Sequence, residues 1–180
     1  DFIDIYTKGY VPPTATSDGF NEIIANFKSG LTAMTIHHTG SSADMEATFG
    51  DDVSAFPFPA GKGQWTSMGD TETVIFESCQ NKEAAFEWVS YLAAGEGQKM
   101  WCEGTGNVPV SKTVQAGDFF QSNRFMKASI DGQSYAGILP ILDTTTEWIS
   151  TLWPNTVSQA LTGSITAEQC MKTLQEGLYR

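Results

Sequence analysis

The chain has 180 residues, of which 41% are hydrophobic, and a formal net charge of −11 at pH 7. This length and composition predict a folded protein of one large domain or two small ones, not a disordered chain. The acidic balance argues against nucleic acid as a partner, and no run approaches the roughly 18 apolar residues that span a bilayer.

An amphipathic helix is the first clear element, because apolar residues recur at the i, i+3, i+4 and i+7 positions between 20 and 27. Ser17 or Asp18 is expected to cap its start. Gly30 follows where a left-handed residue commonly ends a helix.

A small apolar strand is predicted at 31–36, directly after this helix. It leads into His37, His38 and Thr39, and ligands of open α/β sheets lie beyond the carboxyl ends of strands. Two successive histidines in an extended chain point to opposite faces, so we do not expect them to bind one metal together. The alternative for these histidines is a structural role in a turn.

The middle of the chain alternates short elements and loops. Residues 44–49 predict a helix, and residues 53–57 predict a strand that its proline ends or places at an edge. A loop of glycine and small polar residues at 61–70 precedes a β-branched, aromatic strand at 73–76.

Helices dominate the second half. Asn81 is expected to cap a helix whose buried stripe contains Ala85, Trp88, Val89 and Leu92. A helix at 96–102 follows, and residues 118–137 predict a helix and then a surface loop. A further helix at 144–162 is kinked or broken at Pro154. The last helix begins after Ser164 or Thr166 and turns Ala167, Cys170, Met171 and Leu174 inward.

Five motifs in a fixed order occur at Phe27–Met34, Phe56–Gly63, Asn81–Leu92, Gly104–Val110 and Leu161–Met171. The first reads F-x-x-G-x-x-A-M and the second contains P-x-P-x-G. Together they resemble the extracellular solute-binding proteins of ABC importers, in the sugar-type group (family 1) with two lobes and a hinge. The alternation of strands and helices agrees with an α/β protein.

The resemblance implies an α/β fold of the periplasmic binding protein-like type II class, with one nearly complete lobe and part of the other. Residues 1–72 and 140–180 would form the carboxyl-terminal lobe. Residues 73–139 would hold the hinge strand and a segment of the amino-terminal lobe. Members of the family are about twice this length, so we expect a carboxyl-terminal fragment from an extracytoplasmic protein. The helix bearing Trp88 would then expose apolar surface or pair with a second copy of the fragment.

The resemblance also implies the function. A small-molecule solute, a sugar or oligosaccharide, would bind in the interlobe cleft, and closure about a hinge near 73–77 would present it to the ABC permease in the membrane. Such a protein needs no catalytic residue, cofactor or metal.

Ligand contacts are expected from aromatic faces and from planar hydrogen-bonding groups, which together recognise sugars. Where the family often has a tryptophan after the first strand, this chain has Gly40. The alternative role for each tryptophan is packing in the core, above all for Trp153. Trp101, together with Glu103 and Asn107, is a weaker candidate for ligand contact. The expected ligand-binding residues are His37, His38, Thr39, Trp65, Gly69, Asp70 and Trp148.

Two other functions remain open from the sequence. The acidic balance would suit a cationic solute such as a polyamine, held by Asp70 or Glu72. A carbohydrate-active enzyme would need two facing carboxylates, and Asp44, Glu46, Asp70 and Glu72 are available. No nucleophile-elbow, zinc-protease, P-loop or dinucleotide motif occurs.

Three cysteines leave at least one without a partner in the chain. No C-x-x-C spacing of a zinc site is present. The sequence is compatible with two alternatives: a disulfide between Cys79 and Cys102, or three free thiols.

Overall fold

The computed structural model describes residues 2–69 and 71–179. The chain divides into two compact units: unit 1 comprises Asp1–Ile36 with Leu139–Arg180, and unit 2 comprises His37–Ile138. The lobe boundaries implied by the resemblance, 1–72 with 140–180 against 73–139, refer to the whole protein and stay a prediction.

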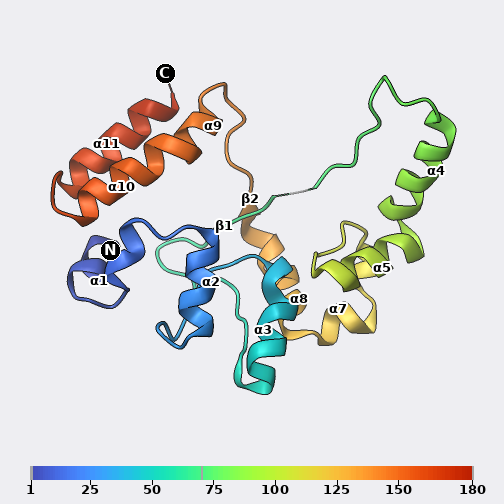
Figure 1. Cartoon of the computed structure of the whole chain (residues 1–180), viewed down its shortest axis with the longest axis horizontal. Helices are drawn as coiled ribbons and strands as arrows, with labels where there is room; N and C mark the ends of the chain where they lie inside the picture. Colours follow the sequence, from blue (N-terminus) through green and yellow to red (C-terminus); the bar gives the residue numbers. More distant parts are fainter. Residues whose placement is uncertain (1, 70, 180) are drawn as a thin grey trace. The chain divides into compact units, whose positions relative to one another are not determined.

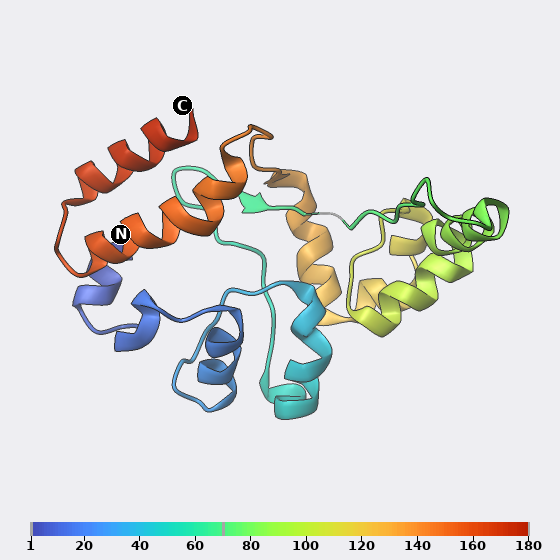
Figure 2. The ribbon, with the colours of Figure 1, turned by 45° about the horizontal axis from the view of Figure 1, so that its top comes forward.

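Unit 1 is helical and its core lies between its last two helices. Ala160, Cys170 and Leu174 are buried there, with Trp148 and Leu152 packed against them. Figures 1 and 2 show α10 and α11 side by side. Its elements are α1 (Phe2–Thr7), the 3-10 turn η1 (Pro13–Thr16), α2 (Phe20–Lys28), α9 (Thr145–Glu147), the π-turn η5 (Trp148–Leu152), α10 (Trp153–Leu161) and α11 (Ala167–Leu178).

The helix predicted around Pro154 continues through the proline. Pro154 has no N–H for the carbonyl of Ser150, and the preceding turn widens so that the N–H of Trp153 donates to the carbonyl of Trp148. Pro154, which predicted a kink or a break in the helix, is therefore accommodated by a π-turn in front of it.

Helix termini follow the sequence only in part. Asn81 stands at the predicted N-cap of the helix that begins at Lys82, but its side chain makes no capping hydrogen bond. The predicted cap of α11 is confirmed at Thr166, whose Oγ1 accepts from the N–H of Gln169 at 3.1 Å while Gln169 Oε1 accepts from the N–H of Thr166 at 2.8 Å. Gly30 has the expected positive φ of 77°. The cap expected from Ser17 or Asp18 is wrong: the N-cap of α2 is Gly19.

Unit 2 contains a second core, in which Cys102, Phe120 and Met126 are buried. Its only sheet among the described residues pairs β1 and β2 in parallel, with Thr66 opposite Ala136. Its elements are η2 (Thr39–Ser41), α3 (Ser42–Phe49), η3 (Gly50–Asp52), β1 (Thr66–Ser67), α4 (Lys82–Ala93), α5 (Gly95–Thr105), α6 (Lys112–Gln115), α7 (Asp118–Ser122), α8 (Arg124–Gly132), η4 (Gln133–Tyr135) and β2 (Ala136–Gly137).

The strands predicted at 31–36, 53–57 and 73–76 do not form. Within the described part of the chain, none of these segments has a partner strand, and a β ladder requires the N–H and C=O groups of a neighbour. Alternation of apolar residues and β-branching describe the side chains of one segment, and they do not say whether a partner strand lies beside it. The two short strands lie instead in segments predicted to be loops.

Two predicted inward faces are partly wrong. Trp88 is 59% exposed and no residue of α4 is buried, so the expected buried stripe is wrong, while the apolar surface expected to be open on this helix is confirmed. On α11, Cys170 and Leu174 are buried as predicted, but Met171 and Ala167 are exposed.

The cysteines are free thiols, so the bridge between Cys79 and Cys102 is absent from the structure. Burial raises the pKa of the Cys102 thiol, which keeps it protonated and unreactive. Across the described residues, no helix has the length and apolar character needed to traverse a membrane.

Candidate functional site

The histidine turn leads into α3 through the 3-10 turn η2. His38 Nδ1 accepts from the N–H of Gly40 at 2.9 Å and caps η2, while His37 Nδ1 lies 3.0 Å from Ser41 Oγ. The ring centroids of His37 and His38 are 4.6 Å apart. The two rings therefore lie beside each other and not on opposite faces, as an extended chain would place them.

This turn rests against the carboxyl end of α5. Gly106 ends α5 with φ of 72°, and a Cβ there would lie 2.9 Å from the carbonyl oxygen of Thr39 and 3.1 Å from Ser42 Oγ. Only glycine combines that backbone conformation with that close approach. The contact brings the histidine turn beside the segment of Asn107, the weaker candidate of the sequence analysis.

Trp65 lies over the backbone of the strand pair. A Cβ at Gly137 would be 2.6 Å from Trp65 Nε1, so the indole needs a glycine beneath it, and 52% of Trp65 stays exposed. Trp65 is therefore in contact with the backbone on one side and exposed on the other. Two residues before Gly137, the hydroxyl of Tyr135 is buried and has no hydrogen-bond partner among the described residues.

The rest of this loop is less informative. Gly69 is exposed, and apart from its chain neighbours no described residue has an atom within 4 Å of the place of a Cβ. Asp70 lies outside the described residues.

Trp148 belongs to unit 1, whereas the histidine turn and Trp65 belong to unit 2. Its Nε1 donates to the carbonyl oxygen of Leu174 at 2.6 Å, and its ring packs 5.2 Å from that of Trp153. Trp153 is 43% exposed, so the packing role expected for it is not observed. Trp148 is the tryptophan that packs against the core of unit 1. A ligand contact from Trp148 stays a prediction.

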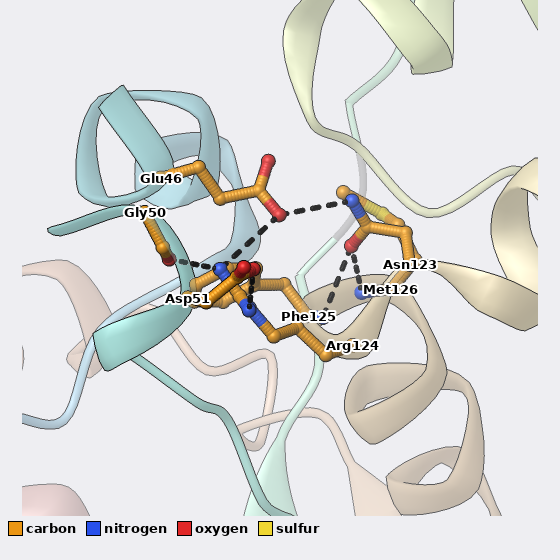
Figure 3. A network of polar contacts seen from close by, with 7 residues as sticks. All are labelled: Glu46, Gly50, Asp51, Asn123, Arg124, Phe125 and Met126. Carbon is orange, nitrogen blue, oxygen red and sulfur yellow. Dashed lines mark hydrogen bonds and ion pairs between the residues drawn. The ribbon is translucent and has the colours of Figure 1, made fainter. Parts of the chain in front are cut away.

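A polar network joins α3 and η3 to the start of α8 (Figure 3). The guanidinium of Arg124 lies 3.5 Å from the carboxylate of Asp51 and 3.9 Å from that of Glu46, and it donates to the carbonyl of Gly50. Asn123 Nδ2 donates to Glu46 Oε1 at 3.5 Å.

The same asparagine caps α8. Its Oδ1 accepts from the N–H groups of Phe125 and Met126 at 3.0 and 3.1 Å. Because α3 follows the histidine turn and α8 leads to β2, this network fixes the elements that carry both candidate groups. Sequence reasoning missed it, although an asparagine before an amphipathic run is a cap signal.

None of the described residues form a group of three or more histidine, cysteine, aspartate or glutamate side chains able to hold a metal ion. The histidine turn offers hydrogen-bonding groups, and Trp65 offers an open indole face.

Comparison with known proteins identifies relatives. Residues 1–128 match a family described as bacterial extracellular solute-binding protein. Among solved structures, the maltose-maltodextrin binding protein of the thermoacidophilic bacterium Alicyclobacillus acidocaldarius is similar with a TM-score of 0.75 and 18% sequence identity. The match covers 99% of this chain and 48% of that protein, so the chain spans about half its length. No curated protein sequence matches.

The structural likeness confirms the predicted fold class, the α/β periplasmic binding protein-like type II fold, of which this mostly helical chain is a part.

Proposed function

The chain belongs to the bacterial extracellular solute-binding proteins, and from this membership we propose that it serves as the solute-binding component of an ABC importer. In this proposal the whole protein binds a sugar or oligosaccharide in its interlobe cleft and delivers it to the membrane permease. The observation that carries the sugar assignment is Trp65, seated on Gly137 with half of its surface open.

An indole held in place suits stacking on the apolar C–H face of a pyranose. Its seat on Gly137 removes alternative orientations before the ligand arrives, which lowers the entropic cost of binding. His37, His38 and Thr39 would supply hydrogen bonds to sugar hydroxyls from the turn that precedes α3. Binding and release need no catalytic group, cofactor or metal, and the proposal assigns none.

The partners in this proposal are the solute and the permease subunits. The exposed apolar face of α4, which includes Trp88, is a surface through which the isolated chain would self-associate. Gel filtration at several concentrations tests this part: a single monomeric peak throughout would overturn it.

Calorimetric titration of the purified chain with maltose, maltotriose and spermidine tests the ligand class. We expect the saccharides to bind, Trp65→Ala to weaken binding by roughly tenfold or more, and Trp65→Phe to retain most of it. Trp153→Ala is the matched control, because Trp153 is similarly exposed but lies in unit 1.

Two outcomes would replace the proposal. Binding of spermidine without saccharide binding would favour a cationic solute. Turnover of chromogenic glycosides would make the protein an enzyme with paired carboxylates.

A further inference from the structure

The connection between η1 and α2 in unit 1 contains an Asp-Gly pair, Asp18–Gly19. At such a pair the backbone nitrogen of the glycine can attack the side-chain carboxyl group of the aspartate, because glycine has no Cβ to obstruct the approach. Gly19 is exposed, and its φ of −92° and ψ of −169° belong to the extended region. The peptide bond between these two residues therefore lies at the surface and outside the helix that follows.

The chain has a second Asp-Gly pair, Asp131–Gly132, in a different setting. Both of its residues belong to the last turn of α8, and Gly132 is buried. In a helix the backbone N–H groups donate to carbonyls one turn earlier, which keeps each nitrogen away from the side chain before it. The carboxylate of Asp131 is in addition paired with the ammonium group of Lys127. The two pairs therefore share a sequence and differ in conformation.

Neighbouring side chains bind both reacting groups of Asp18–Gly19. Asp18 Oδ2 accepts hydrogen bonds from Thr14 Oγ1 at 3.0 Å and from Asn26 Nδ2 at 2.8 Å. The N–H of Gly19 donates to Glu22 Oε2 at 3.0 Å. The carboxylate thus has two donors and the nitrogen has an acceptor, so both groups must leave their partners before they can meet.

We propose that Asp18–Gly19 is a modification site, where isoaspartate forms at a rate that these three hydrogen bonds set. The nitrogen of Gly19 attacks Cγ of the protonated Asp18 carboxyl group. A C–N bond forms, the Cγ–O bond breaks, and the hydroxyl group leaves with the proton of the nitrogen as one water molecule. A second water molecule then opens the five-membered imide, at Cγ to restore aspartate or at the backbone carbonyl carbon to give isoaspartate.

The product changes the backbone directly before α2. In isoaspartate the main chain runs through Cβ and Cγ, which lengthens it by one methylene group, and the free carboxylate is bonded to Cα. The contacts that Thr14 and Asn26 make with the carboxylate must therefore change. Asp18 lies in unit 1 and Trp65 in unit 2, so this proposal and the solute-binding proposal can fail separately.

Peptide mapping with electron-transfer fragmentation, which distinguishes isoaspartate from aspartate of equal mass, measures the product at each Asp-Gly pair. The folded chain is incubated at mildly acidic pH and sampled over time. Isoaspartate should accumulate at Asp18 and not at Asp131. In urea the two pairs should react at similar rates, and Asp18 should react roughly tenfold faster than in the folded chain, the size expected when a hydrogen bond to a charged group is lost.

Variants then test the hydrogen bonds. Asn26→Leu removes the closer donor to Asp18 with little change of size, and it should raise the rate at Asp18 in the folded chain by roughly tenfold. Asn155→Leu is the matched control, because Asn155 also lies inside a helix but is exposed on α10. Should Asn26→Leu fail to fold, Thr14→Val removes the other donor at an exposed position and provides the same comparison.

Three results would overturn the proposal. The first is a folded chain in which Asp18 forms no isoaspartate or reacts only as fast as Asp131. The second is a rate at Asp18 that is the same in urea as in the folded chain. The third is a folded Asn26→Leu or Thr14→Val variant that reacts at the rate of the native chain, because the hydrogen bonds would then not set the rate.

Discussion

Gly177 on α11 faces Leu152 on the π-turn with no room between them for a methyl group. The φ of Gly177 is not positive, so the need for a glycine here comes from tertiary packing and not from backbone conformation. Gly177→Ala should push Leu152 out of the unit 1 core and lower the free energy of unfolding by about 1–3 kcal/mol, the usual cost of overpacking.

Urea denaturation followed by far-ultraviolet circular dichroism measures this change. Gly104→Ala is the matched control: Gly104 also lies inside a helix, but no atom is within 4 Å of the place of a Cβ. That substitution should stabilise the protein by about 0.5–1 kcal/mol through helix propensity. Equal effects of the two changes would contradict the packing argument.

Gln98 is a buried amide that joins two segments of unit 2. Its Nε2 donates to the carbonyl of Ala93 at 2.7 Å, and its Oε1 accepts from the N–H of Ser111 at 3.0 Å. Gln98→Ala leaves both backbone groups without this partner and should cost about 1–3 kcal/mol. Thermal unfolding checks it against Gln121→Ala, whose exposed side chain makes a single bond to Gln115; comparable melting temperatures would show that the Gln98 bonds contribute little.

The N-cap of α8 offers a direct comparison between a bonded and an unbonded asparagine. Asn123 accepts from two backbone N–H groups, whereas Asn81 at the start of α4 makes no capping bond through its side chain. Asn123→Ala should lower the free energy of unfolding by about 1 kcal/mol, and Asn123→Ser should recover part of that loss. Asn81→Ala should change it by only a few tenths of a kcal/mol, and a loss as large as that of Asn123→Ala would be inconsistent with the structure.

The three thiols should differ in reactivity. Cys79 is partly exposed, Cys102 and Cys170 are buried, and burial raises the pKa of Cys102 so that its thiolate is scarce near neutral pH. Intact-mass analysis after iodoacetamide at pH 8 should show one alkylation in the folded chain and three in urea. A single alkylation in urea under non-reducing conditions would instead reveal a disulfide.

Helices were the part of the fold that sequence patterns predicted well. The apolar period at 20–27 and the cap at Thr166 lie in α2 and at the start of α11, because both are local to one helix. The polar network of Asn123 with Glu46 was missed, since its members are 77 positions apart and no local pattern connects them.

The candidate site was predictable only in part. His37, His38 and Trp65 were selected by residue type and by their position after predicted elements. That Trp65 lies on Gly137, and that the histidine turn rests on Gly106, depends on close backbone approaches between distant segments. Glycine alone in a sequence does not say what approaches it.

By itself, the sequence determined the family, through five ordered motifs, and the locations of the principal helices, through periodicity within single segments. Tertiary structure alone decided which segments pair as strands, and that Trp148 rather than Trp153 packs in the core of unit 1. The reason is physical: periodicity specifies that a face is apolar, whereas burial and strand pairing depend on the surface that meets it.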